Sequence, residues 1–137
     1  MNIIISTREL PNVDLLVPRH ALRPLRYRLR DDLQIISKDG QLVADIPKGF
    51  ISDGASVPLF FHRIAPPMGM YLMAALAHDY YCELANDSGE YEERKHGDDN
   101  FHQWLRWCGV SQLRAKPMSA MVKMYGKGLK LTGKTLA

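Results

Sequence analysis

Residues 68–84 read MGMYLMAALAHDYYCEL, and this stretch decides how the chain is organised. Apolar residues fill it at helical spacing, whereas prolines repeatedly interrupt the residues before it. No apolar run in the chain reaches the length of about 20 residues that a membrane-spanning helix needs. The stretch therefore predicts a helix of a globular protein, and it marks the point where the sequence changes from strand-like to helical.

Short segments rich in Ile, Leu and Val dominate residues 1–58. The last two are joined by Lys38-Asp39-Gly40, and an Asp-Gly pair between two such segments is a strong signal for a β-hairpin. The prolines of this part exclude long helices. We therefore predict a small antiparallel β-sheet here, with strands at 2–6, 27–29, 33–37 and 41–46.

Two further helices are predicted after the first one. Residues 91–108 and 111–131 have helical spacing, and Gly109 between them is the residue type that commonly ends a helix. Pro117 lies near the start of the third helix, where it is expected to delay or kink it. The predicted fold class is α+β in a single domain, 1–137, with β-structure and loops in 1–58 and helices in 68–131.

Composition and charge narrow the class of protein. The chain has 137 residues, of which 46% are hydrophobic and 24% charged, as in a soluble globular domain. Its start lacks the basic segment and long hydrophobic core of a signal peptide, so we expect synthesis in a cytoplasm. The net charge of +3 is unevenly spread: residues 69–110 carry three basic and eight acidic side chains, and residues 111–137 carry six basic and no acidic ones.

His78 and Asp79 are the strongest lead to chemistry. Asp98 lies on the next predicted helix, in register with Arg94 and Phe101 at i, i+4 and i+7. Carboxylates and an imidazole from two packed helices can hold a divalent ion, and a water at an open position would then be activated. We therefore predict a metal site for Zn, Mn or Fe formed by His78, Asp79, Asp98 and Asp53, with Asp79 and Arg94 as catalytic groups.

A purely structural role explains the same residues nearly as well. Arg94 can pair with Asp79 or Asp98 in a partly buried network that joins two helices. Asp53 lies in a turn-like segment, where its carboxylate can accept hydrogen bonds from nearby backbone amides. In this alternative the cluster fastens helices together, and the protein has no bound cofactor.

Lysines recur along the third predicted helix. Lys123, Lys127, Lys130 and Lys134 follow one another at intervals of four, three and four, which places them on one helical face. A solvated face is one interpretation, and contact with an acidic protein surface or with nucleic acid is the other. Aromatic residues are not interleaved with the lysines, so specific nucleic-acid recognition is not expected.

Several motifs together resemble one protein family. The chain resembles DUF1353, a family of small proteins found largely in bacteriophages and prophages, over about residues 45–130. The motifs that carry the resemblance are FISDGASVP at 50–58, Gly69, ALAHDYY at 75–81, Arg94 with Asp98 and Phe101, and Gly109-Val110.

The resemblance implies a phage setting but no particular reaction, so two functions stay open. The first is a phage-encoded metal-dependent hydrolase in the host cytoplasm. The second is a virion, tail or host-interaction protein, in which the cluster is structural and the basic C-terminal tail binds a partner or joins an assembly.

Overall fold

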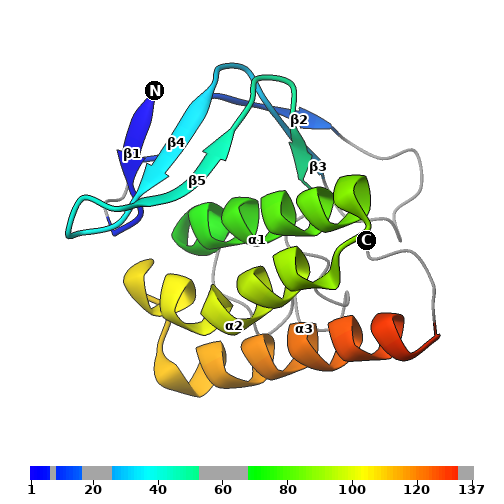
Figure 1. Ribbon diagram of the computed structural model, residues 1–137. Helices are drawn as coiled ribbons and strands as arrows, with labels where there is room; N and C mark the ends of the chain where they lie inside the picture. The colour runs from blue at the N-terminus through cyan, green and yellow to red at the C-terminus, as the bar shows by residue number, and fades with distance from the viewer. Residues whose placement is uncertain (7–8, 17–25, 53–67, 133–137) are drawn as a thin grey trace.

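The α+β prediction is confirmed: two small β-sheets form the N-terminal half, and three helices follow. The computed structural model describes residues 1–6, 9–16, 26–52 and 68–132. The helices are α1 (Met68–Ser88), α2 (Tyr91–Trp107) and α3 (Gln112–Thr132). Figure 1 shows them as successive layers, with the sheets beside α1, α2 in the middle and α3 on the far side.

The first sheet contains the predicted hairpin. Its strands are β1 (Asn2–Ile4), β4 (Leu33–Ile36) and β5 (Leu42–Ile46), in the order β1-β4-β5. β4 and β5 pair antiparallel, and Gly40 between them has φ +87°, a backbone conformation that glycine adopts without strain. β1 pairs with β4 in parallel, so this sheet is mixed rather than purely antiparallel.

The second sheet was only partly predicted. Its strands are β2 (Val13–Leu16), β3 (Arg26–Leu29) and β6 (Ile51–Ser52), in the order β2-β3-β6, with antiparallel pairing throughout. β2 and β6 are too short, and too poor in alternating apolar residues, to be found by pattern. Tyr27 of β3 pairs with a residue on each neighbouring strand, so β3 organises this sheet from its centre.

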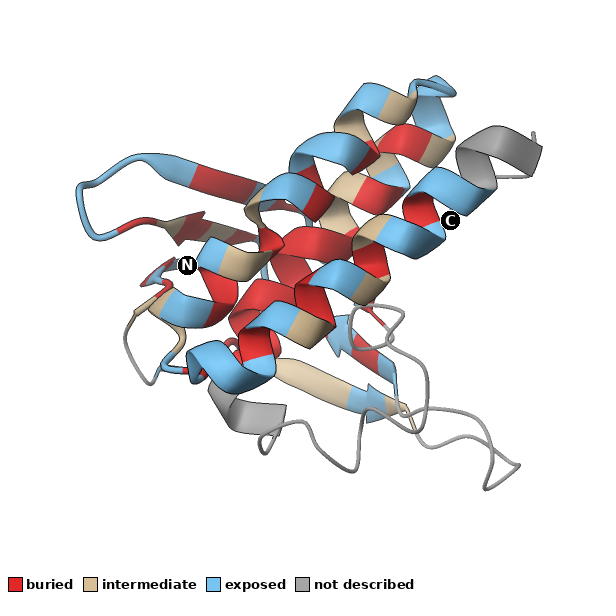
Figure 2. Ribbon diagram, turned by 90° about the horizontal axis from the view of Figure 1, so that it is seen from below, coloured by how far each residue is buried: buried red, intermediate tan, exposed pale blue. Residues whose placement is uncertain are grey.

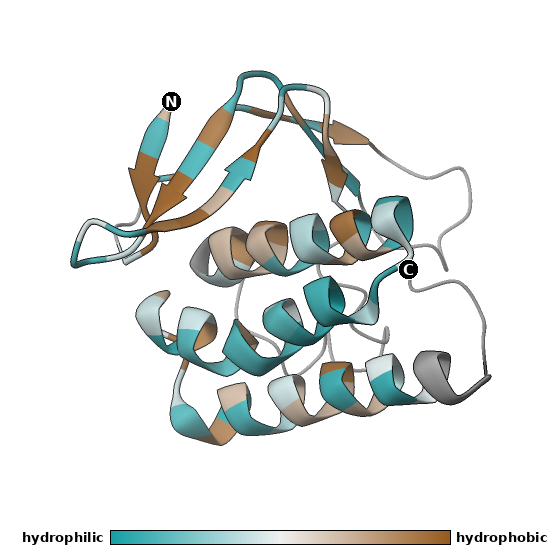
Figure 3. Ribbon diagram, in the orientation of Figure 1, coloured by the Kyte–Doolittle hydropathy of each residue, from teal (hydrophilic) through white to brown (hydrophobic). Residues whose placement is uncertain are grey.

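One face of the first sheet is buried. Ile3, Ile35 and Ala44 lie side by side on this face and are at most 2% exposed. Neighbouring residues in each strand point the other way, as the alternation of hydrophobic and hydrophilic residues along the strands in Figure 3 shows. The sheet therefore has an apolar face toward the core and a polar face toward the outside.

α1 is the central helix of the structure. Every residue from Tyr71 to Asp79 is buried, so this part is enclosed on all sides by other elements. Figure 2 shows buried residues concentrated in the middle of the helical layers, with exposed residues on the outer turns. Residues 71–79 therefore form the centre of the core.

The predicted helix boundaries agree with the structure to within a few residues. Gly109 follows α2 with φ +92°, as expected of a residue that ends a helix. Pro117 lies inside α3, in its second turn, and the helix continues past Gly126 and Gly128 to Thr132. None of the described helices is both long and apolar enough to cross a lipid bilayer.

Candidate functional site

The polar residues predicted on α1 and α2 meet in the core. His78 is fully buried, and Asp98 and Arg94 of α2 are 2% and 1% exposed. Asp79 is 6% exposed and lies next to His78 on α1. On α2, Arg94, Asp98 and Phe101 share the buried face, as their spacing predicted. Three of the four predicted metal ligands and the predicted arginine therefore lie in one cluster.

His78 is held directly by Asp98. The distance between His78 Nε2 and Asp98 Oδ1 is 2.6 Å, which is a short, charge-assisted hydrogen bond between α1 and α2. On the other side of the ring, His78 Nδ1 lies 3.9 Å from Asp79 Oδ1 and 3.8 Å from Cys82 Sγ. The ring also packs against Phe101, with centroids 4.9 Å apart. All sides of the imidazole are thus occupied by protein groups.

The carboxylates around His78 determine its charge. Burial lowers the pKa of His78, but its interactions with Asp79, Asp98 and Cys82 together outweigh burial and raise this pKa well above the ordinary value of 6.5. This raised pKa favours the protonated, positively charged imidazole. A buried imidazolium between two carboxylates forms an ion-paired network in the protein interior, where each charge depends on its partners.

Arg94 extends this network toward α3. Its Nε lies 3.5 Å from Asp98 Oδ2, and its guanidinium carbon lies 5.4 Å from the ring centroid of Tyr125 on α3. Asp98 therefore stands between two cationic groups, His78 of α1 and Arg94 of its own helix. Through these contacts the buried charges link all three helices.

Two glycines allow the helices to approach this network closely. A Cβ at Gly126 of α3 would lie 2.8 Å from Arg94 Nε and would overlap Asp98 Oδ2. A Cβ at Gly97 of α2 would lie 2.9 Å from Tyr81 Cβ and 3.6 Å from His78 Cδ2. Glycine at these two positions is therefore what lets backbone lie against the charged cluster.

Asp79 connects the cluster to the second sheet. Ser52 Oγ of β6 donates a hydrogen bond to Asp79 Oδ2, and both residues are buried. Asp53, the next residue in the chain and the fourth predicted ligand, lies outside the described residues. Asp99, by contrast, is exposed and pairs with Lys95 at 3.1 Å, so it faces away from the cluster.

The described geometry does not form a metal centre. No group of three or more His, Cys, Asp or Glu side chains is arranged to hold an ion within the described part of the chain. Two ligands of one tetrahedral zinc ion, each about 2.0–2.2 Å from it, would be about 3.3 Å apart. His78 Nε2 and Asp98 Oδ1 are closer than that, so they bind each other directly.

Sequence reasoning missed several members of the cluster. Ser52 gave no signal, because a serine in a two-residue strand has no recognisable pattern. Cys82 lies one turn after His78, but a lone cysteine in an apolar helix is usually a buried thiol. Gly126 is of a residue type that weakens helices, so no pattern marked it as a contact. The contact of Gly126 with Asp98 and Arg94 of α2 depends on how the helices pack, which the sequence does not show.

The predicted lysine stripe lies on a helix, as expected. Lys127 is exposed and Lys123 is partly exposed on α3. Lys130 also falls within α3, although its side chain is not described, and Lys134 lies outside the described residues. Partner binding by these lysines stays a prediction.

The first prediction concerns the contact between α3 and the cluster. We expect Gly126→Ala to lower the free energy of unfolding by about 1–3 kcal/mol, because its methyl group would displace Asp98 or Arg94. Gly128→Ala is the matched control: nothing lies within 4 Å of its Cβ, so helix propensity alone should stabilise it by about 0.5–1 kcal/mol. Urea denaturation measures the free energy of unfolding of both variants. Equal effects of the two substitutions would contradict the close approach of α3 to Asp98 and Arg94.

The second prediction concerns the charge of His78. Because its pKa is higher in the folded than in the unfolded state, the stability that it contributes is complete below about pH 6.5 and declines as pH rises through the folded-state pKa. Titration of the His78 ring signals by NMR should therefore show a charged imidazole at pH 7. A neutral ring at that pH would contradict the assigned ion pair with Asp98.

Comparisons with known proteins place these residues in a family. Residues 27–122 match the family described as "Protein of unknown function (DUF1353)". The chain is also 36% identical over 106 residues to "Uncharacterized protein y4jT" of Sinorhizobium fredii (strain NBRC 101917 / NGR234). That alignment covers 76% of this chain and 30% of the relative, so the chain spans less than a third of the relative's length. No solved structure matches significantly.

The family match runs from β3 into α3 and includes His78, Asp79, Arg94 and Asp98 of the buried cluster. Tyr125 and Gly126 of α3 lie beyond it. It therefore covers both sheets' central strands and the α1–α2 contact at His78. On this evidence the chain belongs to the DUF1353 family.

Proposed function

We propose that this protein is a non-catalytic protein-binding domain, and that the outer face of α3 is its binding surface. The observation that carries the proposal is the row of exposed apolar residues on that face. Leu113 is 88% exposed and Met124 is 70% exposed, and Ala120 between them is also exposed. Large apolar side chains that remain in water along one line mark a surface that another molecule can cover.

The helical positions place these residues in one stripe. Leu113, Ala120 and Met124 are related by i, i+7 and i+11, so they lie within about 40° of one another around the axis. The buried residues of α3, such as Ala115 and Val122, lie on the opposite side. α3 thus has two apolar faces: one packs against α2, and the other has no protein element over it among the described residues.

Charge indicates the kind of partner. Lys116 and Lys127 are exposed beside the stripe, and α3 contains no acidic residue. A partner surface that combines apolar groups with carboxylates would complement this face, and such charges increase the rate and specificity of association. This proposal keeps the predicted role of Lys123, Lys127, Lys130 and Lys134 in binding an acidic partner, and it adds the apolar stripe as the main source of affinity.

The buried cluster fits a structural role in such a domain. His78 is completely enclosed and Arg94 is 1% exposed, so neither contacts a molecule outside the protein in the described geometry. Their contacts instead fix α3 relative to α1 and α2. A virion or host-interaction protein, as the phage setting of the family suggests, requires this kind of rigid presentation.

Capture experiments test the binding surface. The tagged full chain, Leu113→Ser/Met124→Ser and the control Leu42→Ser would be compared for proteins retained from host extract and from phage-infected cells. Leu42 is 57% exposed on the hairpin, away from α3. We expect the double substitution to weaken binding of the retained partner at least about 10-fold, and the control to leave it unchanged. Equal binding by all three proteins would overturn the proposal.

A metal-dependent hydrolase is the second candidate, favoured by one observation. The hydrogen bond from Ser52 to Asp79 brings the chain beside Asp79 just before it continues into Asp53. Asp79, together with the predicted ligand Asp53, would suit Zn, Mn or Fe, and such an ion would supply an activated water. His78 and Asp98, which were predicted as further ligands, are hydrogen-bonded to each other. Unless that bond breaks, they would position Asp79 rather than bind the ion. Arg94 would act through Asp98.

Metal analysis separates this candidate from the first. The full chain would be purified without chelators and its metal content measured beside Asp79→Asn, Asp53→Asn and the control Asp99→Asn, which alters an exposed carboxylate of α2. The hydrolase requires stoichiometric metal in the wild type and the control, with loss in the other two variants. Absence of metal from all four proteins after incubation with Zn, Mn and Fe salts would exclude it.

A further inference from the structure

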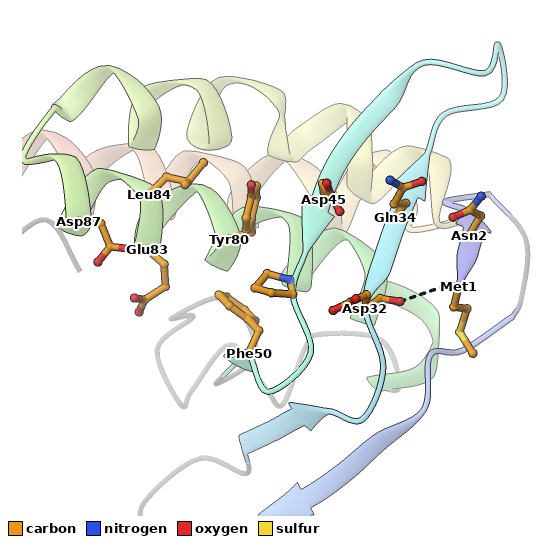
Figure 4. A pocket seen from close by; sticks show the side chains of 11 residues that line it. Met1, Asn2, Asp32, Gln34, Asp45, Phe50, Tyr80, Glu83, Leu84 and Asp87 are labelled. Carbon is orange, nitrogen blue, oxygen red and sulfur yellow. Dashed lines mark hydrogen bonds between the residues drawn. The ribbon is translucent and has the colours of Figure 1, made fainter.

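A groove lies on the opposite side of the molecule from α3. It has a volume of about 750 Å³ and runs between the polar face of the first sheet and the C-terminal half of α1. In Figure 4, Glu83 and Asp87 project from α1 on one side, while Asp45 of β5 and Asp32 lie on the strand side. Carboxylates therefore border the groove on both sides.

The groove is strongly acidic. Its lining by the described residues contains four carboxylates and no Lys or Arg. The Met1 ammonium also lines it and donates to the backbone oxygen of Asp32. None of the four carboxylates forms an ion pair with a basic side chain among the described residues. Carboxylates gathered in this way repel one another, so a cationic occupant would be stabilised there.

Apolar and amide groups give the groove a defined shape. Phe50 and Tyr80 meet edge to face at its base, with ring centroids 6.4 Å apart, and Leu84 lies beside them. Asn2, Gln34 and Asp45 form a row across the three strands on the polar face of the sheet. An occupant with both an apolar side chain and lysines therefore matches this surface better than a simple cation does.

The outer face of α3 combines apolar side chains with lysines, but it cannot reach the groove of the same molecule. α1 and α2 separate α3 from the first sheet (Figure 1). Lys116, Lys127 and the apolar stripe of one molecule can therefore meet such a groove only on another molecule. Each copy carries both surfaces, and their charges are opposite.

We propose that the acidic groove receives the outer face of α3 from a second copy of this chain. This inference rests on the proposed function, because it names the partner of the same α3 surface. Met124 or Leu113 would occupy the aromatic base, and Lys116 and Lys127 would pair with Glu83 and Asp45. Since two different surfaces meet, the contact is heterologous, and repeating it produces rings or open chains of copies.

Complementary charge reversal tests the arrangement. The full chain, a groove variant (Asp45→Lys/Glu83→Lys) and an α3 variant (Lys116→Glu/Lys127→Glu) would be compared by analytical ultracentrifugation at low and high salt. All four positions are exposed, so each variant should fold, which circular dichroism verifies. We expect the wild type to associate beyond two chains at low salt and to dissociate as salt increases, with each variant alone monomeric.

Mixing the two variants gives the decisive result. The groove variant keeps a normal α3 and the α3 variant keeps a normal groove, and the two reversed surfaces are complementary to each other as well. The mixture should therefore regain association beyond two chains, which neither variant shows alone. A wild type that is monomeric throughout would overturn the inference, as would association that only the α3 variant loses, which indicates contact between two α3 faces. If either occurs while Leu113→Ser/Met124→Ser still loses a captured partner, the proposed function stands and only the identity of the partner is wrong.

Discussion

The hydrogen-bonded ion pair between His78 and Asp98 is the contact on which the helical part of the structure depends. It joins α1 to α2 at 2.6 Å in a region with no access to water, and Arg94 carries the same network to Tyr125 of α3. Buried charges are costly to separate from water, so each is stable only while its partners remain in place. The network therefore favours one arrangement of the three helices over shifted ones, which apolar packing alone would distinguish less sharply.

Because this charged network is buried, a binding surface must be formed by other residues. The residues that most resemble an active site are enclosed by the helices that they join, and the accessible features lie elsewhere. On one side α3 exposes leucine, methionine and lysines, and on the other the groove exposes carboxylates over an aromatic base. The core thus holds the outer face of α3 and the groove at a fixed separation, as the proposed assembly through these two surfaces requires. If the protein is a metal-dependent hydrolase, Asp79, which is hydrogen-bonded to Ser52 of β6, is the residue that would bind the ion.

Much of the fold was predictable because it depends on local signals. The Asp39-Gly40 turn, the apolar stretch around Tyr71–Ala77 and the stop at Gly109 each act within a few residues, and the structure confirms them. The parallel pairing of β1 with β4 depends on residues more than 30 positions apart, which no local pattern encodes. For the site, helical spacing placed Arg94 and Asp98 on one face correctly. Ser52 and Gly126 were missed, because their importance arises only from packing against distant segments.

The central claim is that His78 and Asp98 stabilise the protein as a coupled pair. A double-mutant cycle with His78→Gln, Asp98→Asn and both together tests it most directly, with free energies of unfolding measured by urea denaturation at pH 6.5. We expect the second substitution to cost far less once the first is present, with a coupling energy of about 1.5–3 kcal/mol. Effects that are additive within about 0.5 kcal/mol would show instead that the two residues act independently and that no such coupled pair exists.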